Sequence, residues 1–261
     1  MSKQYPWYDS GWLTAYTIAR DFIRKNHPQK LDDFVHAFDV FRTDPEFSVK
    51  KHVGLFDEAT VSELKSLIKQ VDVTRAPDYE LRDFGRFVVH DMPFANVLQE
   101  KITDLVGELV GEPVEPCYNF LSLYWEMGVC KVHMDAPFAK WTVDYCIEQS
   151  SVWPIYFSKI VPWPEDWEYS GKDWQEAIRN DPRNQFEAQL MQEGEAIVFS
   201  GSSQWHYRDP IERVNKSNFC NLIFFHYIPA GTSELTVPLN WKTLFDIPAL
   251  AGLSDSNDYP L

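Results

Sequence analysis

The stretch Tyr124–Asp135 reads Y-W-E-M-G-V-C-K-V-H-M-D, and it holds the two residues around which the fold is organised. His133 and Asp135 are two residues apart, so on a β-strand both side chains leave the same face. A second segment, Gly194–His206, opens with glycine, continues as an apolar run and ends at a histidine. If the two segments fold side by side, a second imidazole joins the first imidazole and the carboxylate.

Two imidazoles and one carboxylate on one face of a metal ion, with the other positions open, form the facial triad of non-haem iron oxygenases. His133, Asp135 and His206 are therefore candidate metal ligands. The H-x-D pattern alone is weak, because three residues can carry it by chance. Two further residues strengthen it: Tyr124 lies nine residues before the first histidine, and Lys216 lies ten residues after the second.

The order of these residues resembles the Fe(II)/2-oxoglutarate-dependent dioxygenases, particularly the prolyl-4-hydroxylase-like branch. The residues that carry the resemblance are Tyr124, Gly128, His133, Asp135, Gly194, His206 and Lys216. Gly128 follows the tyrosine by four residues, where the family commonly has three, which predicts a small bulge or a shifted turn. The resemblance covers roughly residues 92–228.

This resemblance implies Fe(II) as the metal, with 2-oxoglutarate and O₂ as cosubstrates. It implies that Lys216 pairs with the distal carboxylate of 2-oxoglutarate and that Tyr124 donates a hydrogen bond to it, with Arg213 as the second and Arg208 as the third choice of cation. Related halogenases replace the carboxylate ligand by Gly or Ala, so Asp135 favours hydroxylation over halogenation.

The implied fold class is mainly β with flanking helices, built on a double-stranded β-helix of the jelly-roll or cupin type. We expect a single catalytic domain, 1–261, because candidate ligands 73 residues apart must share one site. Residues 1–111 form a largely helical lead-in that buttresses the core, 112–228 form the core with an insertion at 161–192, and 229–261 form a C-terminal extension.

Apolar spacing in the lead-in predicts helices at about 10–25, 57–71 and 92–110 and a strand at 85–90. A further strand is predicted at 234–237. The helices are expected to cover an outer face of the core and to carry no chemistry.

The insertion 161–192 contains Trp163, Trp167 and Trp174 among Asp, Glu, Pro and Gly. A long segment of this kind often covers an active site, in which case its tryptophans would contact substrate. Alternatively, the tryptophans only pack a surface hairpin. The spacing does not decide between these two interpretations.

The net charge of −15 argues against binding to nucleic acid or to an anionic membrane. The N-terminus lacks the apolar core of a signal peptide and no run of about 18 apolar residues occurs, which predicts no spanning helix and a cytoplasmic protein.

The four cysteines lack C-x-x-C spacing and are expected to be buried free thiols. The C-terminal extension covers either the barrel or a neighbouring subunit, so a homodimer is one alternative.

The function favoured by these residues is hydroxylation of a small molecule, such as an amino acid or a natural-product intermediate. The main alternative is a jelly-roll protein that binds a metal as a sensor and turns nothing over. Lys216 separates the two, because a mere metal binder has no need of a cation at that spacing. A third class, another divalent-metal cupin enzyme, would usually show more histidines near the first strand.

Overall fold

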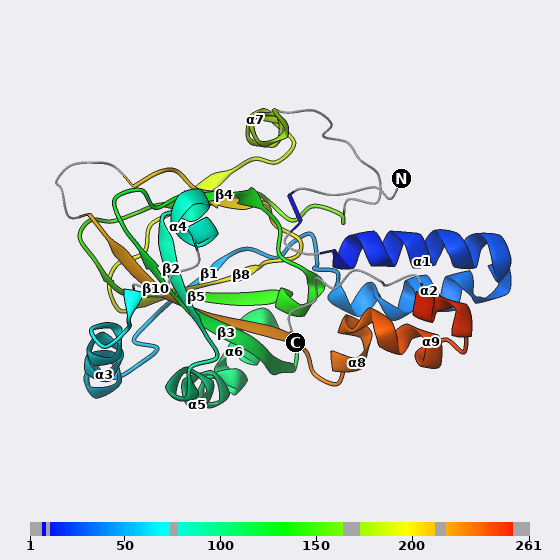
Figure 1. Cartoon of the computed structure of the whole chain (residues 1–261), viewed down its shortest axis with the longest axis horizontal. Helices are drawn as coiled ribbons and strands as arrows, with labels where there is room; N and C mark the ends of the chain where they lie inside the picture. The colour runs from blue at the N-terminus through cyan, green and yellow to red at the C-terminus, as the bar shows by residue number, and fades with distance from the viewer. Residues whose placement is uncertain (1–6, 9–10, 74–77, 164–172, 212–217, 253–261) are drawn as a thin grey trace.

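The structure is a computed structural model that describes residues 7–8, 11–73, 78–163, 173–211 and 218–252. Its described part contains two antiparallel sheets with helices on the outside (Figure 1). The mainly β class with flanking helices is therefore confirmed.

The larger sheet has six strands and the smaller has four. In spatial order the larger consists of β1 (Lys50–Val53), β8 (Glu195–Ser200), β5 (Trp141–Gln149), β10 (Cys220–Pro229), β3 (Val114–Tyr124) and β2 (Arg86–His90). The smaller consists of β4 (Cys130–His133), β9 (His206–Arg208), β6 (Ile155–Phe157) and β7 (Glu187–Gln189). Strand β5 is buried along almost its whole length, as expected for a strand covered on both faces.

Three helices cover the outer face of the larger sheet: α3 (Glu58–Ile68), α5 (Pro93–Lys101) and α6 (Thr103–Val110) (Figure 1). The prediction of one helix over 92–110 is wrong, because the helix breaks at Ile102. The hydroxyl of Thr103 donates to the carbonyl of Gln99 at 3.0 Å, and such local side-chain bonds compete with the helical ladder. A short helix, α4 (Asp78–Phe84), leads into β2.

A second group of helices packs together beside the sheets (Figure 1): α1 (Trp12–Asn26), α2 (Leu31–Ala37), α8 (Ser233–Thr236) and α9 (Trp241–Leu244). Trp12 lies at its centre, with ring centroids 5.5 Å from those of Phe38, Trp163 and Trp241. The C-terminal extension, as far as residue 252, thus packs on the N-terminal helices of its own chain.

The strand predicted at 234–237 is wrong, since this segment forms the helix α8. That helix ends at Val237, which is extended because it precedes Pro238. The insertion contributes one helix, α7 (Trp174–Asn180). Short 3-10 turns complete the connections: Pro28–Lys30, Asp39–Phe41, Pro137–Ala139, Pro238–Asn240 and Pro248–Gly252.

All four cysteines are free, as predicted, but not all are buried. Cys146 and Cys220 are buried, Cys130 is half-buried and Cys117 is exposed. Cys117 is the extra residue of a bulge in β3, where the register against β10 shifts, and a bulged residue leaves the regular alternation of the sheet. The apolar sequence around Cys117 therefore predicted a buried thiol, whereas the bulge exposes it.

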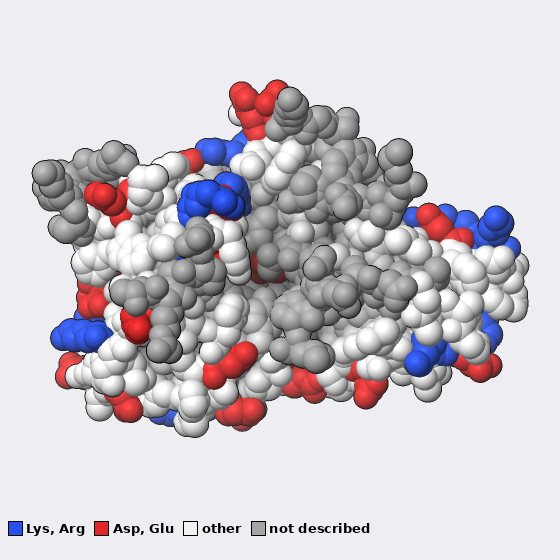
Figure 2. Space-filling model, viewed as in Figure 1, with Lys and Arg blue, Asp and Glu red and all other residues white. Residues whose placement is uncertain are grey.

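On the face shown in Figure 2, acidic and basic side chains are interspersed, and the surface is hollowed near its middle. Among the described residues, no helix combines the length and the apolar character needed to cross a bilayer.

Candidate metal centre and cavity

Two neighbouring strands of the smaller sheet bring the predicted histidines together. His133 ends β4, His206 begins β9, and the two are direct cross-strand partners whose ring centroids are 4.2 Å apart. Asp135 follows β4, and its Oδ1 lies 3.4 Å from Nε2 of His133 and 3.7 Å from Nε2 of His206. One ligand atom from each residue lies within 4.8 Å of the others, which suits a single metal ion.

Backbone carbonyls orient both imidazoles. Nδ1 of His133 lies 2.8 Å from the carbonyl oxygen of Lys131, and Nδ1 of His206 lies 3.0 Å from that of Gln204. A carbonyl only accepts, so each Nδ1 donates a proton, and Nε2, on the side of Asp135, is the nitrogen that a metal ion would bind. This outer-shell arrangement is the one that metal-binding histidines normally use.

The carboxylate is held by its surroundings as well. The hydroxyl of Thr142 donates to Oδ2 of Asp135 at 3.3 Å, and the backbone N–H of Asp135 donates to the carbonyl of Gly201 at 2.9 Å. Burial would raise the pKa of Asp135, but the two imidazoles hold that pKa well below its usual range. Burial and the neighbouring His133 lower the pKa of His206 to about 4. Burial would lower the pKa of His133, but the neighbouring Cys130 and Asp135 raise it well above its usual value, so this ring holds a proton that a metal ion displaces when it binds. The metal-binding forms are an anionic carboxylate and neutral imidazoles, so the donor set fits a divalent ion that releases this proton.

The turn before β4 explains the spacing of Gly128. Its N–H donates to the carbonyl of Trp125 at 2.7 Å. A Cβ on Gly128 would lie 2.8 Å from Cδ1 of Ile211 and 2.9 Å from the oxygen of Trp125, so no side chain fits. The shifted turn expected from the sequence lies at this place, followed by a register irregularity in β4.

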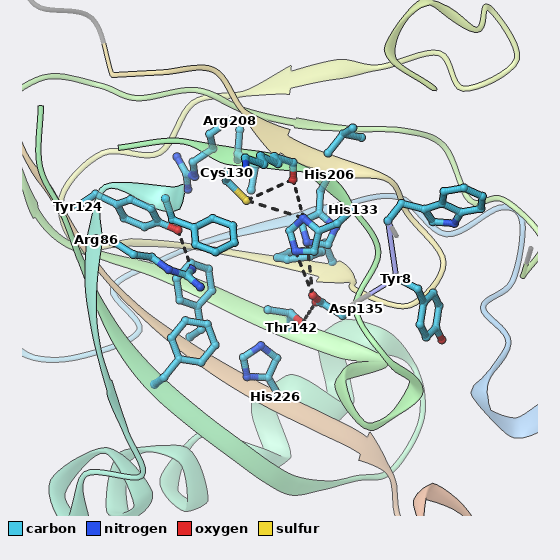
Figure 3. Close-up of a pocket in the computed structure, with 18 of the residues that line it drawn as sticks. Tyr8, Arg86, Tyr124, Cys130, His133, Asp135, Thr142, His206, Arg208 and His226 are labelled. Carbon is cyan, nitrogen blue, oxygen red and sulfur yellow. Dashed lines mark hydrogen bonds and ion pairs between the residues drawn. The ribbon is translucent and has the colours of Figure 1, made fainter. Parts of the chain in front are cut away.

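A cavity of about 390 Å³ adjoins the three candidate ligands and lies between the sheets. Aromatic rings from β3 and β10 form one wall: Tyr118 and His226 stack at 4.0 Å and nearly parallel, and Phe120 stacks on Phe224 at 4.8 Å. His226 thus lies on the cavity wall, below Asp135 in Figure 3.

The insertion reaches the cavity through Trp174, which lines it together with Trp7 and Tyr8. Trp163 does not line the cavity, because it is buried against Trp12 in the helical group. The packing interpretation therefore applies to Trp163. Trp167 lies outside the described residues.

Of the cations predicted to bind 2-oxoglutarate, Lys216 and Arg213 lie outside the described residues. Arg208 lines the cavity, but its Nη2 lies 2.6 Å from Oδ2 of Asp144, and both side chains are buried. The charge of Arg208 is thus already paired.

Sequence reasoning missed another cation at the cavity, Arg86, whose Nη1 donates to the hydroxyl of Tyr124 at 3.0 Å. Arg86 and Tyr124 are cross-strand partners in β2 and β3. Only the alignment of the strand at 85–90 against the strand that ends at Tyr124 could have indicated this contact.

The described fold and site are those of a β-sheet protein with a His-Asp-His group at an interior cavity. No protein-family model and no curated protein matches the sequence. Solved structures do match, among them SnoN, a non-haem α-ketoglutarate-dependent epimerase from nogalamycin biosynthesis. It is 13% identical, with a TM-score of 0.54 over 90% of this chain and 91% of SnoN.

Two further solved structures resemble this chain. HygX from Streptomyces hygroscopicus, solved with nickel, 2-oxoglutarate and hygromycin B, is 10% identical, with a TM-score of 0.51 over 76% of this chain and 86% of HygX. A prolyl-4-hydroxylase from Pseudomonas putida is 9% identical, with a TM-score of 0.50 over 71% of this chain and 95% of that one. At such identities the likeness concerns the fold, and at that level the predicted resemblance to Fe(II)/2-oxoglutarate-dependent oxygenases is confirmed.

Proposed function

We propose that this protein is an Fe(II)- and 2-oxoglutarate-dependent oxygenase that hydroxylates an unactivated C–H bond of a small molecule. The observation that carries the proposal is the orientation of the candidate ligands. Both Nε2 atoms turn toward the carboxylate of Asp135, and each Nδ1 is bonded to a backbone carbonyl. The donor set of two imidazoles and one carboxylate is that of the facial triad.

The order of the strands supports a double-stranded β-helix as the core. From β3 to β10 the chain visits the larger sheet at β3, β5, β8 and β10 and the smaller sheet at β4, β6, β7 and β9. Two four-stranded layers interleaved in this way are expected of the jelly roll that the resemblance implies, and so support this proposal. The extra strands β1 and β2 extend the larger sheet on its two sides.

His133, Asp135 and His206 would hold the iron, which supplies the site at which O₂ and 2-oxoglutarate are brought together and oxidation occurs. The residues of the chain have three tasks there. The carbonyls of Lys131 and Gln204 keep both imidazoles in the binding tautomer. The aromatic rings on the walls would shield the reacting atoms from water, and a small substrate would share the cavity of about 390 Å³ with the cosubstrate.

The substrate class follows from the size of the cavity and from its predominantly aromatic walls. HygX is solved with hygromycin B and SnoN with nogalamycin RO, which supports including natural-product intermediates among the candidate substrates. Since the similar structures also include an epimerase and a carbocyclase, the reaction on the substrate carbon is tested separately from cosubstrate turnover.

The test is to load the purified protein with Fe(II) without oxygen and to add 2-oxoglutarate. We expect the charge-transfer absorption of a metal-bound 2-oxo acid, followed by succinate formation when O₂ is admitted with a panel of candidate substrates. His133→Ala, which removes one of the two candidate imidazole ligands, is the matched variant and should lose both signals. A protein that binds the metal but neither binds nor consumes 2-oxoglutarate would instead be the metal-binding sensor of the alternative hypothesis.

A further inference from the structure

Three described cations line the cavity, and they differ in their ion pairing and in their exposure to solvent. Arg208 is paired with the buried carboxylate of Asp144, and its Nη1 donates to the carbonyl of Trp153. Lys131 is exposed to solvent. Arg86 is sheltered, with 19% of its side chain exposed, and it points toward Tyr124 in Figure 3. Arg86 is therefore the described cation best placed to bind an anion inside the cavity.

The guanidinium of Arg86 is rigidly held. Its Nε donates to Oε2 of Glu80 at 2.7 Å, and its Nη1 donates to the hydroxyl of Tyr124 at 3.0 Å. The rings of Phe84 and Phe120 lie 4.7 Å and 5.8 Å from its Cζ. Within the described part of the chain, Nη2 has no hydrogen-bond partner. A fixed guanidinium with spare N–H groups is the arrangement that recognises carboxylates.

Tyr124 adds a second donor at the same place. Because its oxygen accepts the N–H of Arg86, its own proton is free to point elsewhere. The side chain is only 2% exposed, and burial raises the pKa of Tyr124, so the hydroxyl keeps that proton at neutral pH. The O–H of Tyr124 and Nη2 of Arg86 together form a two-donor site.

This two-donor site belongs to the cavity of the metal centre. Cys130, which also lines the cavity, places its Sγ 3.9 Å from Nδ1 of His133. In Figure 3 Arg86 and Tyr124 lie on one side of the three candidate ligands, and Tyr8 lies on the opposite side. A short dicarboxylate that chelated the metal with one end would find the two donors on the Arg86 side of the cavity.

We propose that Arg86, together with Tyr124, binds the distal carboxylate of 2-oxoglutarate, the role that the sequence resemblance gives to Lys216. This inference rests on the proposed oxygenase function. Glu80 is a positioning residue, because it fixes the guanidinium through Nε and leaves the Nη2 side for the ligand. The cosubstrate would thus be anchored from the edge strand β2, outside the eight strands β3–β10.

The experiment compares two 2-oxo acids on protein loaded with Fe(II) without oxygen, read by the charge-transfer absorption and by calorimetry. 2-Oxoglutarate carries the distal carboxylate, and 2-oxobutyrate lacks it while offering the same chelating end. For Arg86→Gln we expect 2-oxoglutarate to bind about tenfold to hundredfold more weakly, as for the loss of one charge-assisted bond. Binding of 2-oxobutyrate should change by less than about threefold, because none of its atoms reaches the two-donor site.

Three further variants isolate the effect. Arg82→Gln removes a charge from the exposed helix α4, away from the cavity, and should bind both ligands as the wild type does. Glu80→Gln with Arg86→Gln keeps a neutral hydrogen-bonding pair and should fold, bind iron and show the same selective loss. Lys216→Gln, run in parallel, should retain 2-oxoglutarate.

The inference is overturned if Arg86→Gln binds 2-oxoglutarate normally, if it loses both acids equally, or if only Lys216→Gln shows the selective loss. A wild-type protein that binds iron but neither acid would instead refute the oxygenase function itself. The two failures are therefore distinguishable.

Discussion

Gly201 offers a test of the metal centre that changes no ligand. It follows β8, and a Cβ built on it would lie 2.2 Å from Oδ2 of Asp135, 2.5 Å from the carbonyl oxygen of Ala139 and 2.9 Å from Oγ1 of Thr142. Real Cβ contacts are essentially never shorter than 3.0 Å, so Gly201→Ala requires a shift of 3.0 − 2.2 = 0.8 Å at the carboxylate. The backbone of Ala139 confines the methyl group on the other side.

We therefore expect Gly201→Ala to displace the carboxylate of Asp135 from the two imidazoles. The affinity for Fe(II), or for Co(II) as an air-stable probe, should fall about tenfold to hundredfold, as for the loss of support around a metal ligand. Overpacking should also reduce the free energy of unfolding by about 1–3 kcal/mol. Competition with a chelator of known affinity measures the first effect, and denaturant unfolding of the metal-free protein measures the second.

The matched control is Gly252→Ala, because a Cβ on Gly252 would meet no atom of the described residues within 4 Å. This variant should bind metal and unfold like the wild type. If Gly201→Ala folds and binds metal with unchanged affinity, the carboxylate of Asp135 is either not a ligand or not confined by this glycine, and the reasoning fails.

Three other tests have defined outcomes. His133→Ala should abolish stoichiometric iron binding, since it removes one of three ligands; full retention in a metal-content assay would contradict the assignment. Arg208→Met should lower the free energy of unfolding by about 3–5 kcal/mol, because it leaves Asp144 buried and unpaired, and adding Asp144→Leu should recover much of that loss in denaturant titrations. Trp163→Ala should cost about 3–5 kcal/mol of stability with iron and 2-oxoglutarate binding intact; weakened ligand binding in the folded variant would revive its role as a cover.

The grouping of the three candidate ligands was predictable because its signal is local. His133 and Asp135 are two residues apart, and the apolar run before His206 is visible in the sequence, although its strand, β8, ends at Ser200 and His206 begins the next strand, β9. The period of a β-strand then puts the first two side chains on one face. Only the pairing of β4 with β9 had to be supplied by the fold, and the resemblance to a known family supplied it.

The cations of the cavity were not predictable in this way. Arg86 meets Tyr124 across 38 positions, and Arg208 meets Asp144 across 64. Each pairing is set by strand order and register, which spacing along the chain does not encode. The sequence alone therefore did not indicate that Arg208 is paired with a buried carboxylate, whereas Arg86 has an N–H group that can bind a ligand.

For the secondary structure, too, some elements were predictable from the sequence and others were not. The helix α3 was predictable because Asp57 caps it through the N–H of Thr60 and its apolar residues recur at helical spacing. The break at Ile102 and the helix α8 were not, because the pattern of apolar residues does not encode the local hydrogen bonds there, from Thr103 to the carbonyl of Gln99 and from Thr236 to that of Ser233.

The direct cross-strand pairing of His133 with His206 couples metal binding to folding. In the unfolded chain only His133 and Asp135 stay close together, because they are near in sequence. In the native state the pairing of β4 with β9 brings His206, 73 residues from His133, to the same place. An ion that prefers the complete group binds the native state and shifts the folding equilibrium toward it, by about 2.7 kcal/mol when its concentration is a hundred times the dissociation constant. The melting temperature should therefore rise with the metal concentration, so that the supply of the bound metal affects the fraction of the protein that is folded.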